Sequence, residues 1–144
     1  MKKDVVKVRI TYADTDAMGV VYHANYLKWF EIGRTELLRK MGIVYAELEK
    51  TGCNLPLTEV NCQYLAPARY DDILLVETGI DYLKRSNMKF EYIIWDEKME
   101  KMLIEGYSTH AFTNNKGKIV RAPKEFVEKI KGSLDQNSGT IIRA

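Results

Sequence analysis

Two aspartates, Asp14 and Asp16, stand two residues apart just before the longest apolar helical pattern in the chain. A short turn that contains Gly19 follows them, and His23 comes shortly afterwards. A carboxylate can attack an electrophilic carbon or take a proton from water. The start of a helix offers free N–H groups and the positive end of the helix dipole, which favour negative charge. The stretch therefore combines candidate catalytic carboxylates with a site that can hold an anion.

Two other interpretations of the aspartates need to be weighed. In a calcium loop that starts at Asp14, Asp16 and Gly19 fill two expected positions, but Met18 and Asn25 replace two key ligands. Both aspartates could instead serve only as turn and capping groups. That interpretation leaves unexplained why carboxylates should precede a buried apolar segment.

The remaining chemical groups form no familiar catalytic or metal-binding pattern. His23 and His110 are the only histidines, and no zinc ligand set has the proper spacing around them. No serine lies in a Gly-x-Ser-x-Gly setting. Lys84 and Arg85, with Arg121 and Lys124 nearby, could form a phosphate-binding patch, or could be a solvated turn and helix start.

A long buried helix must position the aspartates. Asn25 is the expected N-cap and Gly42 the expected stop. Apolar positions recur at three- and four-residue steps on one face, at Tyr26, Phe30, Gly33, Leu37 and Met41. On the helix surface we expect the ion pairs Glu31–Arg34 and Glu36–Lys40.

Strands joined by short turns make up most of the remaining chain. Alternating apolar residues predict strands at 5–12, 55–65, 73–82, 88–94 and 102–112, and a short last strand at 118–121. Further helices are expected at 43–50 and 123–131, with a fraying polar tail at about 132–144. Short turns favour antiparallel neighbours, so the fold class is α+β, with one buried helix against one twisted antiparallel sheet.

The whole chain, residues 1–144, fits one domain with a real core. A formal net charge of +2 is too small to suggest nucleic acid as a partner. The N-terminus lacks the apolar run of a secretion signal, and no stretch reaches membrane-spanning length. Cys53 and Cys62 have no paired-motif spacing and suit a reducing compartment. These features predict a cytoplasmic protein.

Residues 14–26, DTDAMGVVYHANY, resemble the signature of hot-dog-fold acyl-CoA thioesterases of the hydroxybenzoyl-CoA thioesterase type. They are especially similar to the subgroup associated with the bacterial Tol–Pal system. The resemblance continues at Phe30-Glu31 with Arg34, at residues 64–72 and at residues 118–123. It extends to about Lys131, so it covers nearly the whole chain.

The resemblance implies a hot-dog fold, in which an antiparallel sheet wraps around one long central helix. It also implies a homo-oligomer, with paired protomers and the acyl-CoA site between them, and neither cofactor nor metal. Asp16 matches the catalytic carboxylate of the family. The backbone N–H of His23 matches the group that polarises the thioester carbonyl, and the role of the His23 side chain stays open. The predicted substrate-binding residues are Gly19, Val20, Val21, Asn25, Lys84, Arg85, Ser86 and Arg121.

The sequence therefore favours hydrolysis of an acyl-CoA thioester by Asp16, either as a nucleophile or as a general base. One alternative is a hot-dog hydratase or dehydratase that uses His23 with Asp16. Another is a binding module for acyl-CoA or acyl carrier protein without catalytic activity. The acyl group and the choice between dimer and tetramer are not determined by the sequence.

Overall fold

One curved sheet forms the framework of the protein. The computed structural model describes residues 3–135 and 141–142. Five strands follow the order β1-β3-β4-β5-β2, and each pair of neighbours runs antiparallel. They are β1 (Lys3–Arg9), β2 (Leu57–Tyr64), β3 (Ile73–Leu83), β4 (Asn87–Asp96) and β5 (Met102–Ala111). A two-residue strand, β6 (Ile141–Ile142), pairs with β3 in parallel. The strands at 5–12, 55–65, 73–82, 88–94 and 102–112 were thus predicted to within a few residues.

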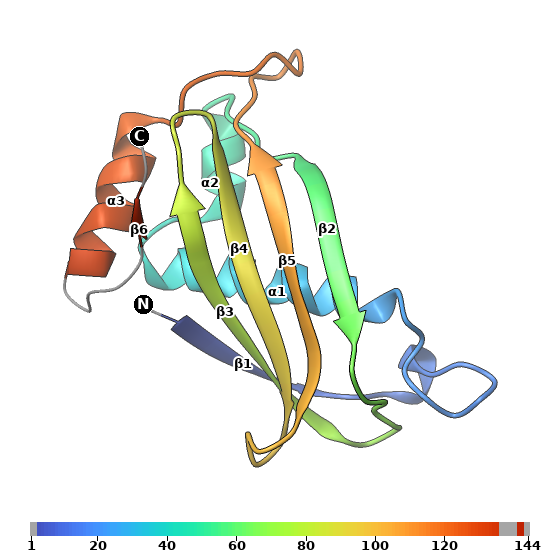
Figure 1. The fold of residues 1–144 in the computed structure, drawn as a ribbon. Helices are drawn as coiled ribbons and strands as arrows, with labels where there is room; N and C mark the ends of the chain where they lie inside the picture. Colours follow the sequence, from blue (N-terminus) through green and yellow to red (C-terminus); the bar gives the residue numbers. More distant parts are fainter. Residues whose placement is uncertain (1–2, 136–140, 143–144) are drawn as a thin grey trace.

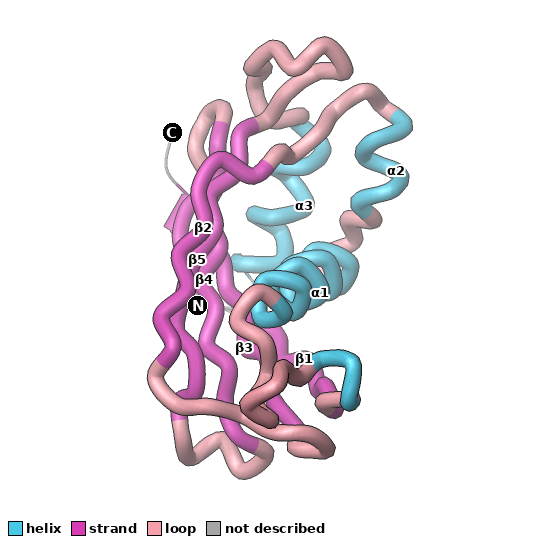
Figure 2. Tube along the Cα trace, turned by 90° about the vertical axis from the view of Figure 1, so that its right-hand side faces the viewer, coloured by secondary structure: helices cyan, strands magenta, loops and turns pink. Residues whose placement is uncertain are grey.

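The helix α1 (Asn25–Lys40) crosses the concave face of the sheet (Figures 1 and 2). Its first turn lies against β2, where the rings of Tyr26 and Tyr64 are 5.7 Å apart. Its last turn reaches β1, where Lys40 pairs with the buried Asp4. Two shorter helices, α2 (Tyr45–Lys50) and α3 (Lys124–Asp135), complete the fold. The predicted α+β hot-dog arrangement is therefore confirmed.

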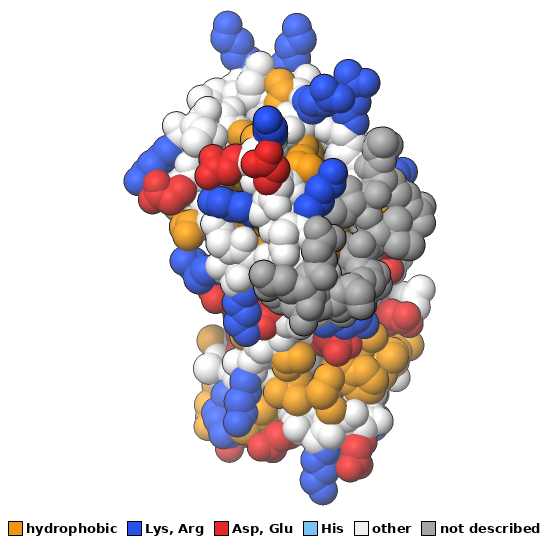
Figure 3. All heavy atoms as spheres, turned by 90° about the vertical axis from the view of Figure 1, so that its left-hand side faces the viewer, with side chains coloured by type: hydrophobic (Ala, Val, Ile, Leu, Met, Phe, Trp, Pro, Cys, Tyr) orange, Lys and Arg blue, Asp and Glu red, His pale blue; other side chains and the backbone are white. Residues whose placement is uncertain are grey.

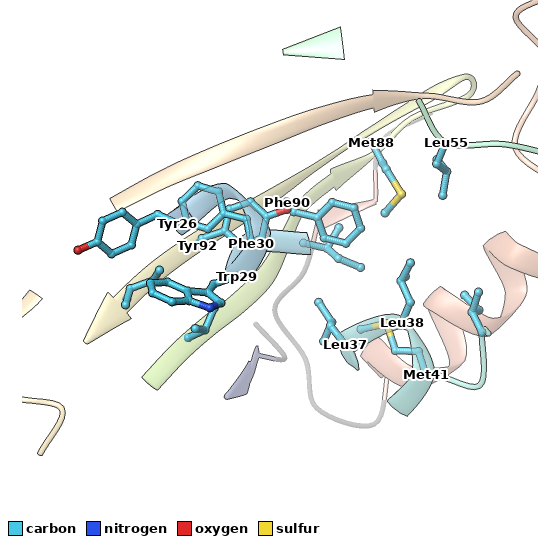
Figure 4. Packing of buried hydrophobic residues seen from close by; sticks show 14 of the residues in the cluster. Tyr26, Trp29, Phe30, Leu37, Leu38, Met41, Leu55, Met88, Phe90 and Tyr92 are labelled. Carbon is cyan, nitrogen blue, oxygen red and sulfur yellow. The ribbon is translucent and has the colours of Figure 1, made fainter. Parts of the chain in front are cut away.

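Two glycines allow α1 to approach the sheet closely. A Cβ atom on Gly33 would lie 2.3 Å from Thr78 Oγ1 on β3. A Cβ atom on Gly106 would lie 2.9 Å from the ring of Phe30, which instead stacks on Tyr92 with ring centroids 4.1 Å apart. Figure 4 shows Phe30 and Tyr92 at the centre of the apolar core between helix and sheet. The core thus fixes the position of α1 and of its first turn.

Several local predictions were wrong. Asn25 is the first residue of α1 and Ala24 is the N-cap, so Asn25 does not cap the helix. The predicted strand at 118–121 is only an isolated bridge between Thr113 and Ile119. The last helix continues to Asp135, because the buried Leu134 holds its final turn on the core. Most of the tail predicted to fray lies outside the described residues.

The predicted ion pairs on α1 are also different. Glu36 pairs with Arg39, and Lys40 turns to Asp4. Within the described residues, Glu31 and Arg34 make no ion pair. Glu36 thus keeps a local i, i+3 partner, but that partner is Arg39, because Lys40 pairs with Asp4 on β1. None of the helices in the described part of the chain is long and apolar enough to cross a membrane.

Candidate active site

Asp16 opens a tight turn directly before α1. Its N–H donates to the carbonyl of Val20 at 2.9 Å, and its own carbonyl accepts from Gly19 N–H at 3.0 Å. Gly19 has φ +79°, which explains the glycine at this position. One carboxylate oxygen, Oδ1, accepts from Met18 N–H at 2.8 Å. The side chain is half-buried, so the turn holds the carboxylate in place while leaving it accessible.

Asp14 connects this turn to the helix. The carboxylate of Asp14 is buried and accepts from Thr11 N–H, from Thr11 Oγ1 and from Lys28 Nζ at 2.9–3.0 Å. Burial raises the pKa of Asp14, but these hydrogen bonds and the Lys28 charge outweigh it and lower that pKa. The carbonyl of Asp14 accepts from Tyr22 N–H and from Asn25 Nδ2. Asp14 is therefore a structural anchor, and the Asn25 side chain serves the same function.

The backbone before α1 presents free donors. Among the described residues, the N–H groups of His23 and Ala24 have no hydrogen-bond acceptor. The carbonyl of His23 accepts from Tyr64 Oη at 2.9 Å, which ties the start of the helix to the end of β2. The His23 ring is exposed and lies against Tyr22, with centroids 4.4 Å apart. This geometry can donate hydrogen bonds to an oxyanion near Asp16.

The other predicted residues of the motif support the turn. Val20 forms a bridge to Arg69, and the N–H of the buried Val21 donates to the carbonyl of Ala68. Aromatic side chains line the helix start next to them. Burial raises the pKa of Tyr26 and of Tyr64 to about 12, so both hydroxyls stay protonated at neutral pH. These tyrosines were not predicted as site residues, although alternation along β2 placed Tyr64 on the same face as Cys62.

The predicted phosphate-binding residues come together at a different place. Ala122 N–H donates to the carbonyl of Arg85, and Phe112 N–H donates to the carbonyl of Ser86. Arg121 therefore lies beside the turn that carries Lys84 and Arg85. Lys and Arg side chains gather at this end of the molecule, at the top of Figure 3. In Figure 1 the β3–β4 turn is at the top and the loop before α1 is at the lower right. Within one chain, the cations and Asp16 are thus at opposite ends.

A buried polar chain lies between α1 and the sheet. Ser108 Oγ is 2.8 Å from His110 Nε2 and 2.6 Å from Tyr92 Oη. Burial lowers the pKa of His110 to about 4, so the imidazole is neutral. Alternation along β5 placed Ser108 and His110 on the buried face, which could have signalled this contact. Among the described residues, no group of three or more His, Cys, Asp or Glu side chains is placed to hold a metal ion.

Comparisons with known proteins identify the family of the chain. The model of the thioesterase-like superfamily matches residues 10–130. The chain is 36% identical over 104 residues to YneP of Bacillus subtilis, provisionally named an acyl-CoA thioesterase, covering 72% of this chain and 75% of that protein. It is 41% identical over 85 residues to the acyl-CoA thioesterase YbgC of Haemophilus influenzae, covering 58% and 62% respectively. The structure resembles DHNA-CoA thioesterase from Staphylococcus aureus with a TM-score of 0.88 at 27% identity, covering 99% of each chain.

Proposed function

Because the chain belongs to the thioesterase-like superfamily, we propose that it is a cytoplasmic enzyme that hydrolyses acyl-CoA thioesters to a carboxylic acid and free CoA. One observation carries the proposal for the site. The accessible carboxylate of Asp16 is held by the Met18 N–H directly before a helix start whose His23 and Ala24 N–H groups are free among the described residues. The closer placement in the Tol–Pal-associated subgroup stays a prediction.

The proposed reaction replaces a carbon–sulfur bond with a carbon–oxygen bond. Either the Asp16 carboxylate takes a proton from water as the water oxygen attacks the carbonyl carbon, or it attacks the carbon itself and water then cleaves the anhydride. The His23 N–H stabilises the negative charge that develops on the carbonyl oxygen. The C–S bond breaks and CoA departs as a thiolate, which receives the proton that the attacking water loses in either route. Thiolate is a competent leaving group, so Asp16 needs no nucleophilic serine beside it.

We propose a homo-oligomer built on pairs of chains. The edge strand β2 exposes Leu57, Val60 and Tyr64, and α1 exposes Leu27 and Ile32 on either side of its buried stripe. An unpaired strand edge with apolar side chains favours pairing with an identical edge through a two-fold axis. The two-fold axis turns the second chain upside down relative to the view of Figure 1. The end of the second chain that carries Lys84 and Arg85 then lies beside the Asp16 end of the first chain. Lys84, Arg85, Ser86 and Arg121 would then bind the CoA phosphates of the partner's substrate.

The geometry favours hydrolysis over the two alternatives. A hydratase would require the His23 imidazole beside Asp16, but no hydrogen bond joins these two side chains among the described residues. A binding module for acyl-CoA or acyl carrier protein does not need the free N–H groups beside a carboxylate.

A thiol-release assay with a panel of acyl-CoA thioesters tests the proposal. Hydrolysis releases one free thiol and one carboxylic acid per turnover, both of which can be measured. Hydration of a double bond without thiol release would indicate the hydratase, and binding without either product would indicate the binding module. A screen over aliphatic and aromatic acyl groups also identifies the substrate.

A further inference from the structure

A small cavity lies between α1, α2 and the sheet, at the end of the molecule opposite Asp16. Its volume is about 170 Å³, and Leu38, Leu55 and Phe90 form apolar walls. An apolar cavity of about 150 Å³ is large enough to take up a benzene molecule. The space therefore suits one ring or a chain of about six carbons.

The direction of each hydrogen bond behind the cavity follows from its chemistry. His110 Nδ1 is 3.1 Å from the carbonyl of Leu55, which only accepts, so Nδ1 carries the proton. In the neutral ring Nε2 must then accept from Ser108 Oγ, and Ser108 Oγ accepts from the Tyr92 hydroxyl. Both ring nitrogens of His110 are therefore occupied. His110 forms part of the wall and offers no hydrogen bond to a ligand.

Arg34, Thr35 and Tyr45 supply the other donors of the lining. Arg34 makes one long hydrogen bond within the described residues, 3.5 Å from Nη1 to Tyr92 Oη, although a guanidinium has five N–H donors. The Tyr45 hydroxyl accepts from Leu55 N–H at 3.1 Å and keeps its own proton to donate. Glu31 also lines the cavity, but it is exposed and solvated. The cavity thus combines apolar walls with several N–H and O–H groups that have no acceptor among the described residues.

We propose that this cavity binds the acyl group of the substrate, and that Arg34 selects short acyl groups that end in an oxygen acceptor. The inference rests on the proposed hydrolysis and gives its substrate class. Arg34 follows Asn25 by nine residues, or about 13 Å along the helix, which exceeds the length of a short acyl group. In this proposal the acyl group comes from the thioester held by the other chain of the pair. The cavity lies near the Leu57 end of β2. When two β2 edges pair antiparallel, the Tyr64 end of β2 in the second chain, and with it the loop that carries Asp16, lies beside this cavity.

Binding of two matched thioesters tests the selectivity. Glutaryl-CoA and 5-methylhexanoyl-CoA have acyl groups of similar shape, but only the first ends in a carboxylate. In an Asp16→Asn background, which slows hydrolysis, we expect calorimetry to give about tenfold or more tighter binding of glutaryl-CoA. Adding Arg34→Met should remove the difference, Arg34→Lys should keep part of it, and the exposed Arg39→Met should leave it unchanged. Equal affinities before the Arg34 change, or a preference that survives it, would overturn the inference.

Mixing two variants tests whether the site spans two chains. Asp16→Asn and Arg34→Met chains each lack a different part of it. After unfolding and refolding together in equal amounts, about a quarter of the sites should combine Asp16 of one chain with Arg34 of the other. Glutaryl-CoA hydrolysis should then rise to about a quarter of the unmodified rate. A rate equal to the mean of the two separate variants would contradict a shared site. Absence of thiol release from unmodified protein would refute the proposed hydrolysis, while the binding experiment would still decide the role of Arg34.

Discussion

Replacing Gly33 by alanine tests how closely α1 packs on the sheet. The added Cβ would lie 2.3 Å from Thr78 Oγ1 and 3.2 Å from Val76 Cγ1, so the helix or β3 must shift. Overpacking of a core costs typically about 1–3 kcal/mol, while alanine gains up to about 1 kcal/mol over glycine inside a helix. We expect a net loss of about 1–2 kcal/mol in the free energy of unfolding.

Urea denaturation of four variants isolates the effect of the contact. Gly132→Ala is the matched control, because this glycine is also helical but has no neighbouring atom within 4 Å of the added Cβ. It should gain up to about 1 kcal/mol. Thr78→Ala removes the clashing hydroxyl, which is buried without a partner among the described residues. The double variant Gly33→Ala/Thr78→Ala should recover about 1 kcal/mol relative to the sum of the single changes. Equal stabilities of Gly33→Ala and Gly132→Ala would refute the reasoning.

Three further results are expected. Because burial lowers the pKa of His110 to about 4 from 6.5, the unfolded chain binds a proton below pH 6.5 that the native state does not. His110 should thus reduce the unfolding free energy by about 2–3 kcal/mol between pH 7 and pH 4.5, and urea titrations of His110→Gln should show a weaker pH dependence. Lys84→Ala/Arg85→Ala should raise the KM for acyl-CoA and weaken the salt dependence of KM. If both quantities are unchanged, the turn does not bind the CoA phosphates and is only a solvated turn. Light scattering should show at least a dimer at assay concentration, and a stable, active monomer would contradict the two-chain site.

The sequence predicted the elements better than their ends. Alternation and helical periodicity located the main strands and α1, because residue patterns report directly which face is buried. The N-cap prediction failed because Asn25 uses its side chain to hold the Asp14 carbonyl, a contact between residues that are apart in the sequence. The prediction of a strand at 118–121 failed because this segment makes only the isolated Thr113–Ile119 bridge and a few single backbone hydrogen bonds, such as Val120 N–H to the carbonyl of Phe112.

From the sequence, the candidate site could be predicted only where its residues belong to one continuous motif. The 14–26 stretch places Asp16, Gly19 and the His23 N–H in the one loop that precedes α1, so the local sequence brings them together. The cavity beside Arg34 draws its walls from α1, α2, β4, β5 and the segment before β2. No local pattern specifies that Leu55 and Arg34 share a cavity, and the distance between Asp16 and the cationic end becomes apparent only in three dimensions.

Turnover of Asp16→Asn protein tests the central claim most directly. Asparagine is nearly isosteric and its side-chain oxygen can still accept from Met18 N–H, so the fold should persist. It cannot attack a carbonyl or take a proton from water, so kcat should fall about a hundredfold or more, with little change in acyl-CoA affinity or melting temperature. Asp14→Asn is the matched control, and it should lower the melting temperature with a milder effect on kcat, because Asp14 is a buried anchor. Near-normal kcat in folded Asp16→Asn protein would contradict the proposed mechanism.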